Sequence, residues 1–311
     1  MRAVAAAARG LDREGPAWKV HLALAVAQTG FALFPIFGKL ALGSIPPFVL
    51  AAIRVVSAAL LLELVRRASG AQPIPRADRG RLFLFALLGV SFNQVLFILG
   101  LSMTTAIHTS ILMSSIPVFT LATAAFLRHE TLSPRAVAGM LLAATGAFLL
   151  LSAQGFDWES RFFRGDLLLL ANCLSYSLFL VLSRPILARC EPLTFVTAIF
   201  RYGAIPIVLV SLPAIRSFSP SSVTPSAWAS LAAIVFFSTA IPYFLNTWAL
   251  ARTDASRVAA YVFFQPLVAS GLAILVLRER PGWMTAVAAA LILAGLAVSI
   301  RRARLPLRPL P

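Results

Sequence analysis

Long apolar runs alternate with short polar breaks along almost the whole chain. Ten runs are each close to the ~20 residues that an α-helix needs to cross a bilayer. They cover residues 19–41, 47–65, 82–101, 105–127, 135–153, 166–184, 193–212, 227–250, 256–277 and 283–300. The runs are rich in Ala and Leu and lack the two-residue alternation of a β-strand. The pattern therefore predicts an all-α integral membrane protein with ten transmembrane helices.

A spacing of 149 residues recurs within this pattern. Pro117, Glu130 and Gly146 are repeated as Pro266, Glu279 and Gly295. We interpret the prolines as helix kinks, the glutamates as caps of free amides and the glycines as points of close helix packing. Five predicted helices separate the two copies, which is an odd number. The second half should therefore enter the membrane upside down, which gives two inverted five-helix repeats.

The repeat also predicts the division of the chain into segments. Nearer the start of each half the spacing shortens slightly, so that Lys39 matches Arg184 at 145 residues and Arg54 matches Arg201 at 147. The expected segments are a cytoplasmic N-terminal segment 1–18, a first repeat 19–153, an extracytoplasmic linker 154–165, a second repeat 166–301 and a cytoplasmic tail 302–311. The N-terminal run 3–8 is too short, and its flank too charged, for a cleaved signal sequence.

Composition agrees with a membrane protein. The chain of 311 residues is 59% hydrophobic and 12% charged, whereas about a quarter of a soluble domain is charged. The net charge of +16 comes from basic residues in short loops rather than on one face, which argues against a nucleic-acid partner. Of the 27 Lys and Arg residues, 19 fall on one side of the predicted bilayer and six on the other. This asymmetry predicts a multi-pass protein of the plasma (inner) membrane with both termini in the cytoplasm.

The sequence offers no signature of an enzyme. It lacks His-Glu-x-x-His, Gly-x-Ser-x-Gly and a phosphate-binding loop. Its two cysteines, Cys173 and Cys190, match neither a disulfide framework nor a metal-ligand spacing. We therefore expect no enzymatic activity, no cofactor and no metal.

Several short motifs resemble the EamA branch of the drug/metabolite transporter superfamily. They are Gly38-Lys39, Ala51-Ala52-Ile53-Arg54, Asn93-Gln94, Gly100-Leu101, Thr104-Thr105-Ala106, Pro117-Val118-Phe119-Thr120 and Phe126-Leu127-Arg128-His129-Glu130, with a second-half echo at Leu277-Arg278-Glu279-Arg280. The resemblance covers residues 19–301. The Arg-His-Glu ending differs from the family's usual pattern and leaves His129 unexplained.

The resemblance implies a secondary transporter with two inverted halves that works by alternating access. It also implies that helices 1–4 and 6–9 line a central cavity, while helices 5 and 10 lie at the periphery. Related members export amino acids, other metabolites or toxic compounds. The resemblance says almost nothing about which substrate this chain takes.

Ionisable residues inside the predicted helices are the first candidates for substrate contact, because each is costly in a membrane. Arg54 and Arg201 lie about two turns into matching helices and could meet a substrate carboxylate or phosphate at two gates. Alternatively, each could snorkel or bind carbonyl groups of neighbouring helices. His108 corresponds to Arg257 in the second half and could titrate near neutral pH, although it lies near a helix start.

Neutral polar and aromatic side chains in the inward-facing helices are the other candidates. They are Gln28, Asn93, Gln94, Asn172, Tyr176, Tyr243, Asn246, Trp248, Tyr261 and Gln265. Each needs a polar partner away from water, so some could simply join neighbouring helices. Asn93 and Gln94 are adjacent and should point to different faces, so at most one is expected to contact substrate directly.

Carboxylates are missing from the middle of every predicted helix. Glu63 lies near the end of the second helix and Asp166 opens the sixth. An exporter of lipophilic cations would be expected to carry a buried carboxylate. We therefore predict export of a small neutral, zwitterionic or anionic metabolite such as an amino acid, by a monomer or dimer in the lipid bilayer. An exporter of cationic drugs is the alternative, and a membrane sensor or scaffold is a more remote one.

Overall fold

The computed structural model describes residues 17–71, 78–104, 109, 112–128, 133–152, 160–187, 189–268 and 283–300. Every regular element within these residues is a helix, and six of the helices are long and apolar enough to cross a membrane. The prediction of an all-α membrane protein is therefore confirmed for the part of the chain that the structure describes. Glu130, Glu279, His108 and His129 lie outside it.

The first half of the chain contains seven described elements. They are α2 (Ala17–Leu42), α3 (Pro47–Ser69), α4 (Arg79–Ala86), the π-helix η2 (Leu87–Ser91), α5 (Phe92–Met103), α7 (Ile116–Phe126) and α8 (Pro134–Ser152). Prolines and glycine set the ends of α3. Pro47 occupies the first turn, where no backbone donor is needed, and Gly70 adopts a left-handed conformation at the C-terminal end (φ 70°).

The second half is built in a similar way. Its elements are α9 (Ser160–Leu187), α10 (Pro192–Arg216), the 3-10 turn η3 (Pro220–Ser222), α11 (Pro225–Val235), the π-helix η4 (Phe236–Ala240), α12 (Ile241–Leu250), α13 (Ala255–Ala260), the 3-10 turn η5 (Tyr261–Phe263) and α15 (Trp283–Ile300). The hydroxyl of Thr224 caps α11 by accepting a hydrogen bond from the Ala227 amide at 3.3 Å.

Two π-helical turns interrupt otherwise α-helical spans, one in each half. η2 separates α4 from α5, and η4 separates α11 from α12. The starting residues Leu87 and Phe236 are 149 positions apart, which is the spacing of the sequence repeat. A π-turn displaces the regular i−4 pairing and is often found at functional sites. Both turns lie next to the polar centre described below.

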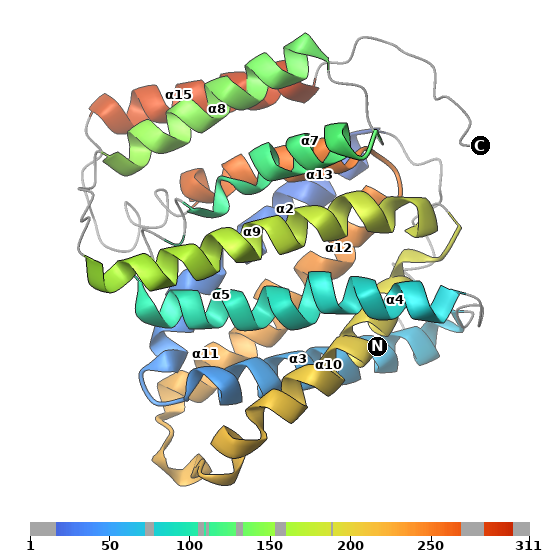
Figure 1. Ribbon diagram of the computed structural model, residues 1–311, viewed down its shortest axis with the longest axis vertical. Coiled ribbons are helices and arrows are strands. Elements are labelled where there is room, and N and C mark those ends of the chain that lie inside the picture. The colour runs from blue at the N-terminus through green and yellow to red at the C-terminus, as the bar shows by residue number, and fades with distance from the viewer. Residues whose placement is uncertain are drawn as a thin grey trace.

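Helices from the two halves pack against each other rather than forming separate bodies. α2 contacts α12, α9 contacts α5, and α3 contacts α10. α8 and α15 form a pair of their own, seen at the top of Figure 1. Gly146 and Gly295 allow this pair to approach closely, since a Cβ atom on Gly295 would lie 2.4 Å from the Ala143 nitrogen. The prediction that both glycines are packing points is confirmed.

Pro117 has a different position from the one expected. Instead of kinking a continuous helix, it lies in the first turn of α7, directly after a turn at Ser114 and Ser115. A proline in a first turn costs no helical hydrogen bond, so the chain breaks here and restarts.

Candidate functional site

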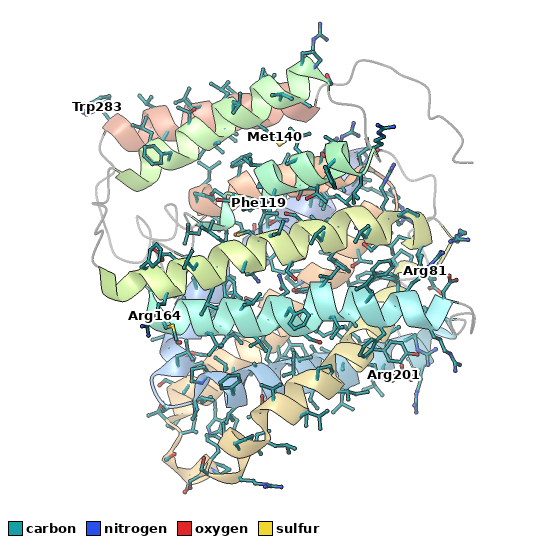
Figure 2. All side chains as sticks on the ribbon, viewed as in Figure 1. Arg81, Phe119, Met140, Arg164, Arg201 and Trp283 are labelled. Atoms are coloured by element: carbon teal, nitrogen blue, oxygen red, sulfur yellow. The ribbon has the colours of Figure 1, made fainter. Side chains whose placement is uncertain are left out.

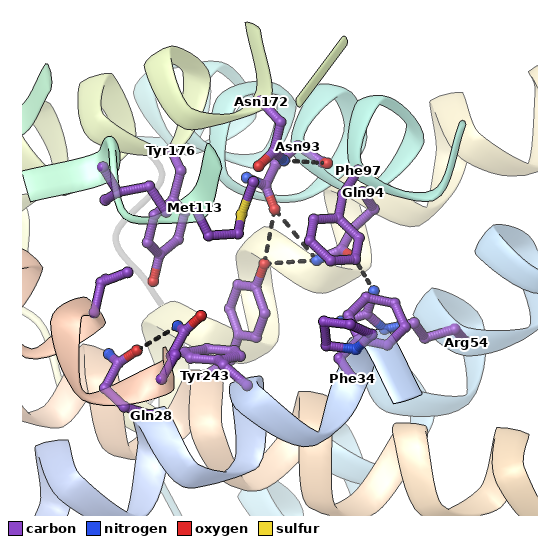
Figure 3. A pocket seen from close by; sticks show the side chains of 15 residues that line it. Gln28, Phe34, Arg54, Asn93, Gln94, Phe97, Met113, Asn172, Tyr176 and Tyr243 are labelled. Carbon is purple, nitrogen blue, oxygen red and sulfur yellow. Dashed lines mark hydrogen bonds between the residues drawn. The ribbon is translucent and has the colours of Figure 1, made fainter. Parts of the chain in front are cut away.

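A small cavity with both polar and apolar lining side chains lies among α2, α3, α5, α9 and α12 (Figure 3). Its volume is about 60 Å³, well below the ~300–1,000 Å³ typical of ligand pockets. Eight of the residues proposed from the sequence line it: Gln28, Arg54, Asn93, Gln94, Asn172, Tyr176, Tyr243 and Gln265. None of the described lining residues belongs to α8 or α15. Helices would have to separate for the cavity to admit a metabolite.

Arg54 is the charged residue of this cavity. Its side chain is 1% exposed on α3. Nε donates to the Thr239 hydroxyl at 2.7 Å, and Nη1 donates to the side-chain oxygen of Gln94. The guanidinium carbon lies 3.8 Å from the centre of the Phe34 ring, within the range of a cation–π contact. The described partners of Arg54 are all neutral, so its charge is solvated but not cancelled.

Tyr243 on α12 extends this network, because Gln94 on α5 bonds to both Arg54 and Tyr243. Its hydroxyl accepts a hydrogen bond from Gln94 Nε2 at 2.5 Å and lies 3.0 Å from Asn93 Oδ1. The same hydroxyl lies 3.3 Å from the carbonyl oxygen of Gly89, within π-helix η2. Asn172 on α9 donates to the Asn93 carbonyl at 2.6 Å. Figure 3 shows the side chains of Asn93 and Gln94 converging on the Tyr243 hydroxyl.

A second series of hydrogen-bonded polar side chains lies on the other side of the cavity. Gln265 Nε2 donates to Gln28 Oε1 at 2.7 Å, and Gln28 Nε2 donates to Asn246 Oδ1 at 3.4 Å. Asn246 Nδ2 in turn donates to the Tyr176 hydroxyl at 2.9 Å. These four side chains come from four separate segments, so their hydrogen bonds link those segments across the bundle. Asn246 is held behind the cavity and is absent from its lining.

The remaining candidates lie elsewhere. Trp248 is buried, its indole is stacked 4.1 Å from the Arg252 guanidinium carbon, and its Nε1 has no hydrogen-bond partner among the described residues. Tyr261 is buried in η5 and bonds to His21 rather than facing the cavity. His108 lies outside the described residues.

Arg201 is exposed and is not brought to the cavity with Arg54, as the sequence pairing had led us to expect. Figure 2 shows it at the right-hand edge of the bundle, on the same side as Arg81. The residue that matches Thr239 at 149 positions is Val90, which lies against Gly203 on α10 and cannot accept a hydrogen bond. The buried acceptor that holds Arg54 therefore has no counterpart for Arg201.

Sequence reasoning missed three residues at or near this centre. Thr239 supplies an acceptor to Arg54, and Phe34 supplies the aromatic face. His21 Nδ1 lies 2.5 Å from the Tyr261 hydroxyl and links α2 to η5. His21 is an ionisable residue inside a predicted span, so its residue type alone could have flagged it. Thr239 and Phe34 could not have been singled out in this way, because threonine and phenylalanine are common in apolar helices.

Two similar contacts lie near the C-terminal ends of α2 and α9, which are on opposite sides of the bundle in Figure 1. Lys39 at the end of α2 donates to the Thr104 carbonyl at 2.5 Å, while the Thr104 hydroxyl donates to Asp166 at 2.9 Å. Arg184 near the end of α9 donates through Nε to the Thr253 carbonyl at 3.0 Å. Thr104 and Thr253 are 149 residues apart. The basic residues that the sequence had matched therefore make matching contacts.

The described residues offer no metal centre, since no three of their His, Cys, Asp or Glu side chains cluster together. The cavity itself offers amide, hydroxyl and guanidinium groups with aromatic walls. It is suited to noncovalent recognition of a small polar molecule.

Comparisons with known proteins point to one family. The model of the EamA-like transporter family matches twice, over residues 18–152 and 163–301. An uncharacterized transporter of Archaeoglobus fulgidus is 29% identical over 89% of this chain and 96% of its own length. The uncharacterized transporter YyaM of Bacillus subtilis is 22% identical, with 80% and 84% covered. A crystal structure of a protein at 22% identity superposes with a TM-score of 0.75 over 90% of this chain and 96% of its own, which supports the fold.

Proposed function

The chain belongs to the EamA-like transporter family, and from this premise we propose that it moves a small metabolite through the central cavity by alternating access. The proposed cargo is an amino acid or a related zwitterion or anion, and the proposed direction is export. The observation that carries the proposal is a buried, uncancelled cation, Arg54, in a cavity whose other lining side chains are neutral.

We further propose ten membrane-spanning helices arranged as two inverted five-helix repeats. Three features support this arrangement: the family model matches twice, the π-helices η2 and η4 start 149 residues apart, and Lys39 and Arg184 make matching carbonyl contacts. The proposed repeat boundaries are 19–153 and 166–301, joined by an extracytoplasmic linker. Inverted repeats place the substrate site at their interface, near the bilayer midplane.

Alternating access would open the cavity to one side at a time. The small cavity volume, about 60 Å³, supports a conformer that must expand before it binds. The contacts of Lys39 and Arg184 join helices at opposite ends, so we assign each to one closed end. Release of one contact while the other holds would expose the cavity to a single side.

Cationic compounds remain the alternative cargo. The aromatic walls, which include Phe31, Phe97 and Tyr176, could hold a cation through π-contacts. Against this, no residue in the described lining is acidic, and Arg54 would repel a cation. We propose a monomer in the plasma (inner) membrane with both termini in the cytoplasm, on the basis of the charge asymmetry.

Purified protein reconstituted in liposomes tests the proposal. Counterflow of radiolabelled amino acids, measured for a mixture of the proteinogenic set, is expected to exceed that of empty liposomes. Cationic dyes under a pH gradient form the second arm. Transport restricted to the dyes would favour the alternative, and absence of transport in both arms would remove the proposed function.

A further inference from the structure

Arg54 has more hydrogen-bond donors than the protein uses. A guanidinium carries five N–H donors in a planar fork. Nε bonds to Thr239 and Nη1 bonds to Gln94, while Nη2 has no acceptor among the described residues. Arg54 lines the cavity, so its unused N–H donors belong to a side chain that borders the cavity. Figure 3 shows the guanidinium between Phe34 and Gln94 at one side of the cavity.

The charge of this group is also unmatched locally. No other lining residue is charged, and the partners of the guanidinium are a hydroxyl, an amide oxygen and an aromatic ring. A guanidinium pairs well with a planar carboxylate, because two parallel N–H donors meet two oxygens. A single arginine balances one negative charge, whereas a phosphate dianion would leave one charge uncancelled in the membrane interior. The site therefore favours a monocarboxylate over a phosphate.

We propose that Arg54 binds the carboxylate of the substrate through its unused donors, and that Thr239 and Gln94 are positioning residues that hold the guanidinium in place. This inference rests on the proposed transport function and adds the chemical group that the site selects. It assigns the single carboxylate of an amino acid or a related monocarboxylic acid to this side of the cavity.

The positioning of Arg54 begins at π-helix η4. The Thr239 hydroxyl donates to the carbonyl of Ile234, five residues earlier, at 2.8 Å. Its proton is thus committed to that carbonyl, and its lone pairs are left to accept from Arg54 Nε. η4 adds one residue to a helical turn. In a regular α-helix, a residue other than Thr239 would therefore face Arg54 Nε.

Gln94 is oriented from the other side. Its Nε2 donates to the Tyr243 hydroxyl at 2.5 Å, which turns its Oε1 toward Arg54 Nη1. The two positioning contacts therefore reach Arg54 from different halves of the chain. They fix two sides of the guanidinium and leave the rest of the fork for a ligand.

Arg201 provides a matched control within the same chain. The sequence pairs it with Arg54, yet it is exposed and lies 5.6 Å from the Tyr202 ring, away from the cavity lining. Its replacement by lysine makes the same Arg-to-Lys exchange without touching the site. An effect of the Arg-to-Lys exchange that does not depend on the cavity would appear in both variants.

The test measures carboxylate selectivity in protein purified into nanodiscs. The probes are the proteinogenic L-amino acids, each compared with its primary amide, which keeps the ammonium and side chain but loses the negative charge. Binding is followed by the ligand-dependent rise in unfolding temperature. We expect at least one amino acid to bind about tenfold or more tightly than its amide, as loss of a charge-assisted pair implies.

The variants separate the contribution of the planar guanidinium of Arg54 from the contribution of its positive charge. Arg54→Lys keeps the charge but loses the fork, and Thr239→Val removes the hydroxyl with little change in shape. Both are expected to weaken binding of the amino acid about tenfold while leaving the amide unchanged. Arg201→Lys should stay within about twofold of wild type. Thr239→Val retains Arg54, so it also tests the inference if Arg54→Lys does not fold.

Two results would overturn the inference. One is equal binding of acids and amides by the wild type, and the other is undiminished carboxylate preference in both Arg54→Lys and Thr239→Val. Counterflow with the same probes distinguishes failure of the carboxylate-binding inference from failure of the proposed transport function. Transport of amides or cations without carboxylate preference leaves a transporter with a different site, whereas absence of any transport removes the function itself.

Discussion

Gln94 and Tyr243 are joined by a 2.5 Å hydrogen bond at the centre of the bundle, and they lie 149 positions apart in the sequence. The same spacing separates Pro117 from Pro266 and η2 from η4. Residues that match in two halves of a duplicated chain can touch each other only near the axis that would relate those halves. The contact therefore supports the proposed two-fold relation of the halves, whose axis would pass close to Gln94, the partner of Arg54.

Tyr243→Phe should destabilise the protein and impair transport. The change removes the hydroxyl that bonds to Gln94 and Asn93, leaving buried polar groups without that partner. We expect a loss of about 1–3 kcal/mol in the free energy of unfolding. Thermal unfolding in detergent measures it. Tyr202→Phe is the control, because no hydrogen bond of the Tyr202 hydroxyl is found among the described residues, and equal losses in both variants would contradict the central role of Tyr243.

Gly295→Ala should separate α8 from α15. A Cβ atom at Gly295 would lie 2.4 Å from the Ala143 nitrogen and 2.6 Å from the Gly139 oxygen, and backbone atoms cannot yield as a flexible side chain would. Overpacking of this kind costs about 1–3 kcal/mol, measurable as a lower unfolding temperature. Gly80→Ala is the matched control, since its Cβ would meet nothing within 4 Å. A neutral Gly295→Ala would show that the two helices can shift apart freely.

The contacts at the two ends should differ in their response to salt. Arg184 pairs with Asp254 at 2.7 Å and also bonds to the Thr253 carbonyl. Asp254→Asn keeps the carbonyl bond, so we expect a loss below about 1 kcal/mol that shrinks as salt rises. Arg184→Met loses both contacts and should cost more.

Lys39→Met is the comparison for this prediction at the opposite end of the bundle. Lys39 bonds to a backbone carbonyl, and no ion pair of Lys39 is found among the described residues. Its replacement should therefore lower the unfolding temperature by an amount that depends little on salt. A strong salt dependence for Lys39→Met, or none for Asp254→Asn, would contradict the assignment of the ion pair to the Arg184 end.

Cys190 should react slowly with maleimide in the folded protein. Burial raises the pKa of its thiol above the ordinary value, and the negative charge of Asp78 adds to the rise. A raised pKa means less thiolate at a given pH, so alkylation should be slower than in protein unfolded by detergent and should accelerate only at more alkaline pH.

The variant Asp78→Asn removes one cause of this rise. It should lower the pKa of Cys190 and speed alkylation at the same pH, as followed by mass spectrometry of the modified peptide. Cys173, buried within α9, is expected to stay unmodified until the protein unfolds. Equal alkylation rates in the folded and unfolded states would show that Cys190 is accessible and that the pKa of its thiol is not raised.

Fusions test the orientation that the basic residues predict. Green fluorescent protein fused to either terminus should fluoresce, since it folds in the cytoplasm. Alkaline phosphatase inserted between residues 154 and 159, ahead of α9 (Ser160–Leu187), should be active outside the cytoplasm. The physical reason is that Lys and Arg concentrate on one side of the predicted bilayer. The reverse pattern of reporter activity would invert the proposed topology.

The polar residues of the cavity illustrate how far sequence reasoning reached. Gln28, Tyr176 and Gln265 could be proposed because an amide or hydroxyl in an apolar span must find a polar partner. Tyr261 was proposed on the same grounds, and it does find a partner, but that partner is His21 outside the cavity. The need for a partner follows from residue type, whereas the identity of the partner depends on which helices become neighbours.

The sequence by itself determined that this chain is helical and belongs in a membrane, and it contained a duplication marked by Pro117 and Pro266. These properties are local or periodic, so hydrophobicity and spacing suffice to reveal them. The tertiary structure decided which of two matched arginines enters the cavity. Arg54 meets the Thr239 hydroxyl on η4, whereas the residue that matches Thr239 in the first half is Val90. A buried arginine requires acceptors from distant segments, and only the packing of the helices brings those acceptors to one of the two.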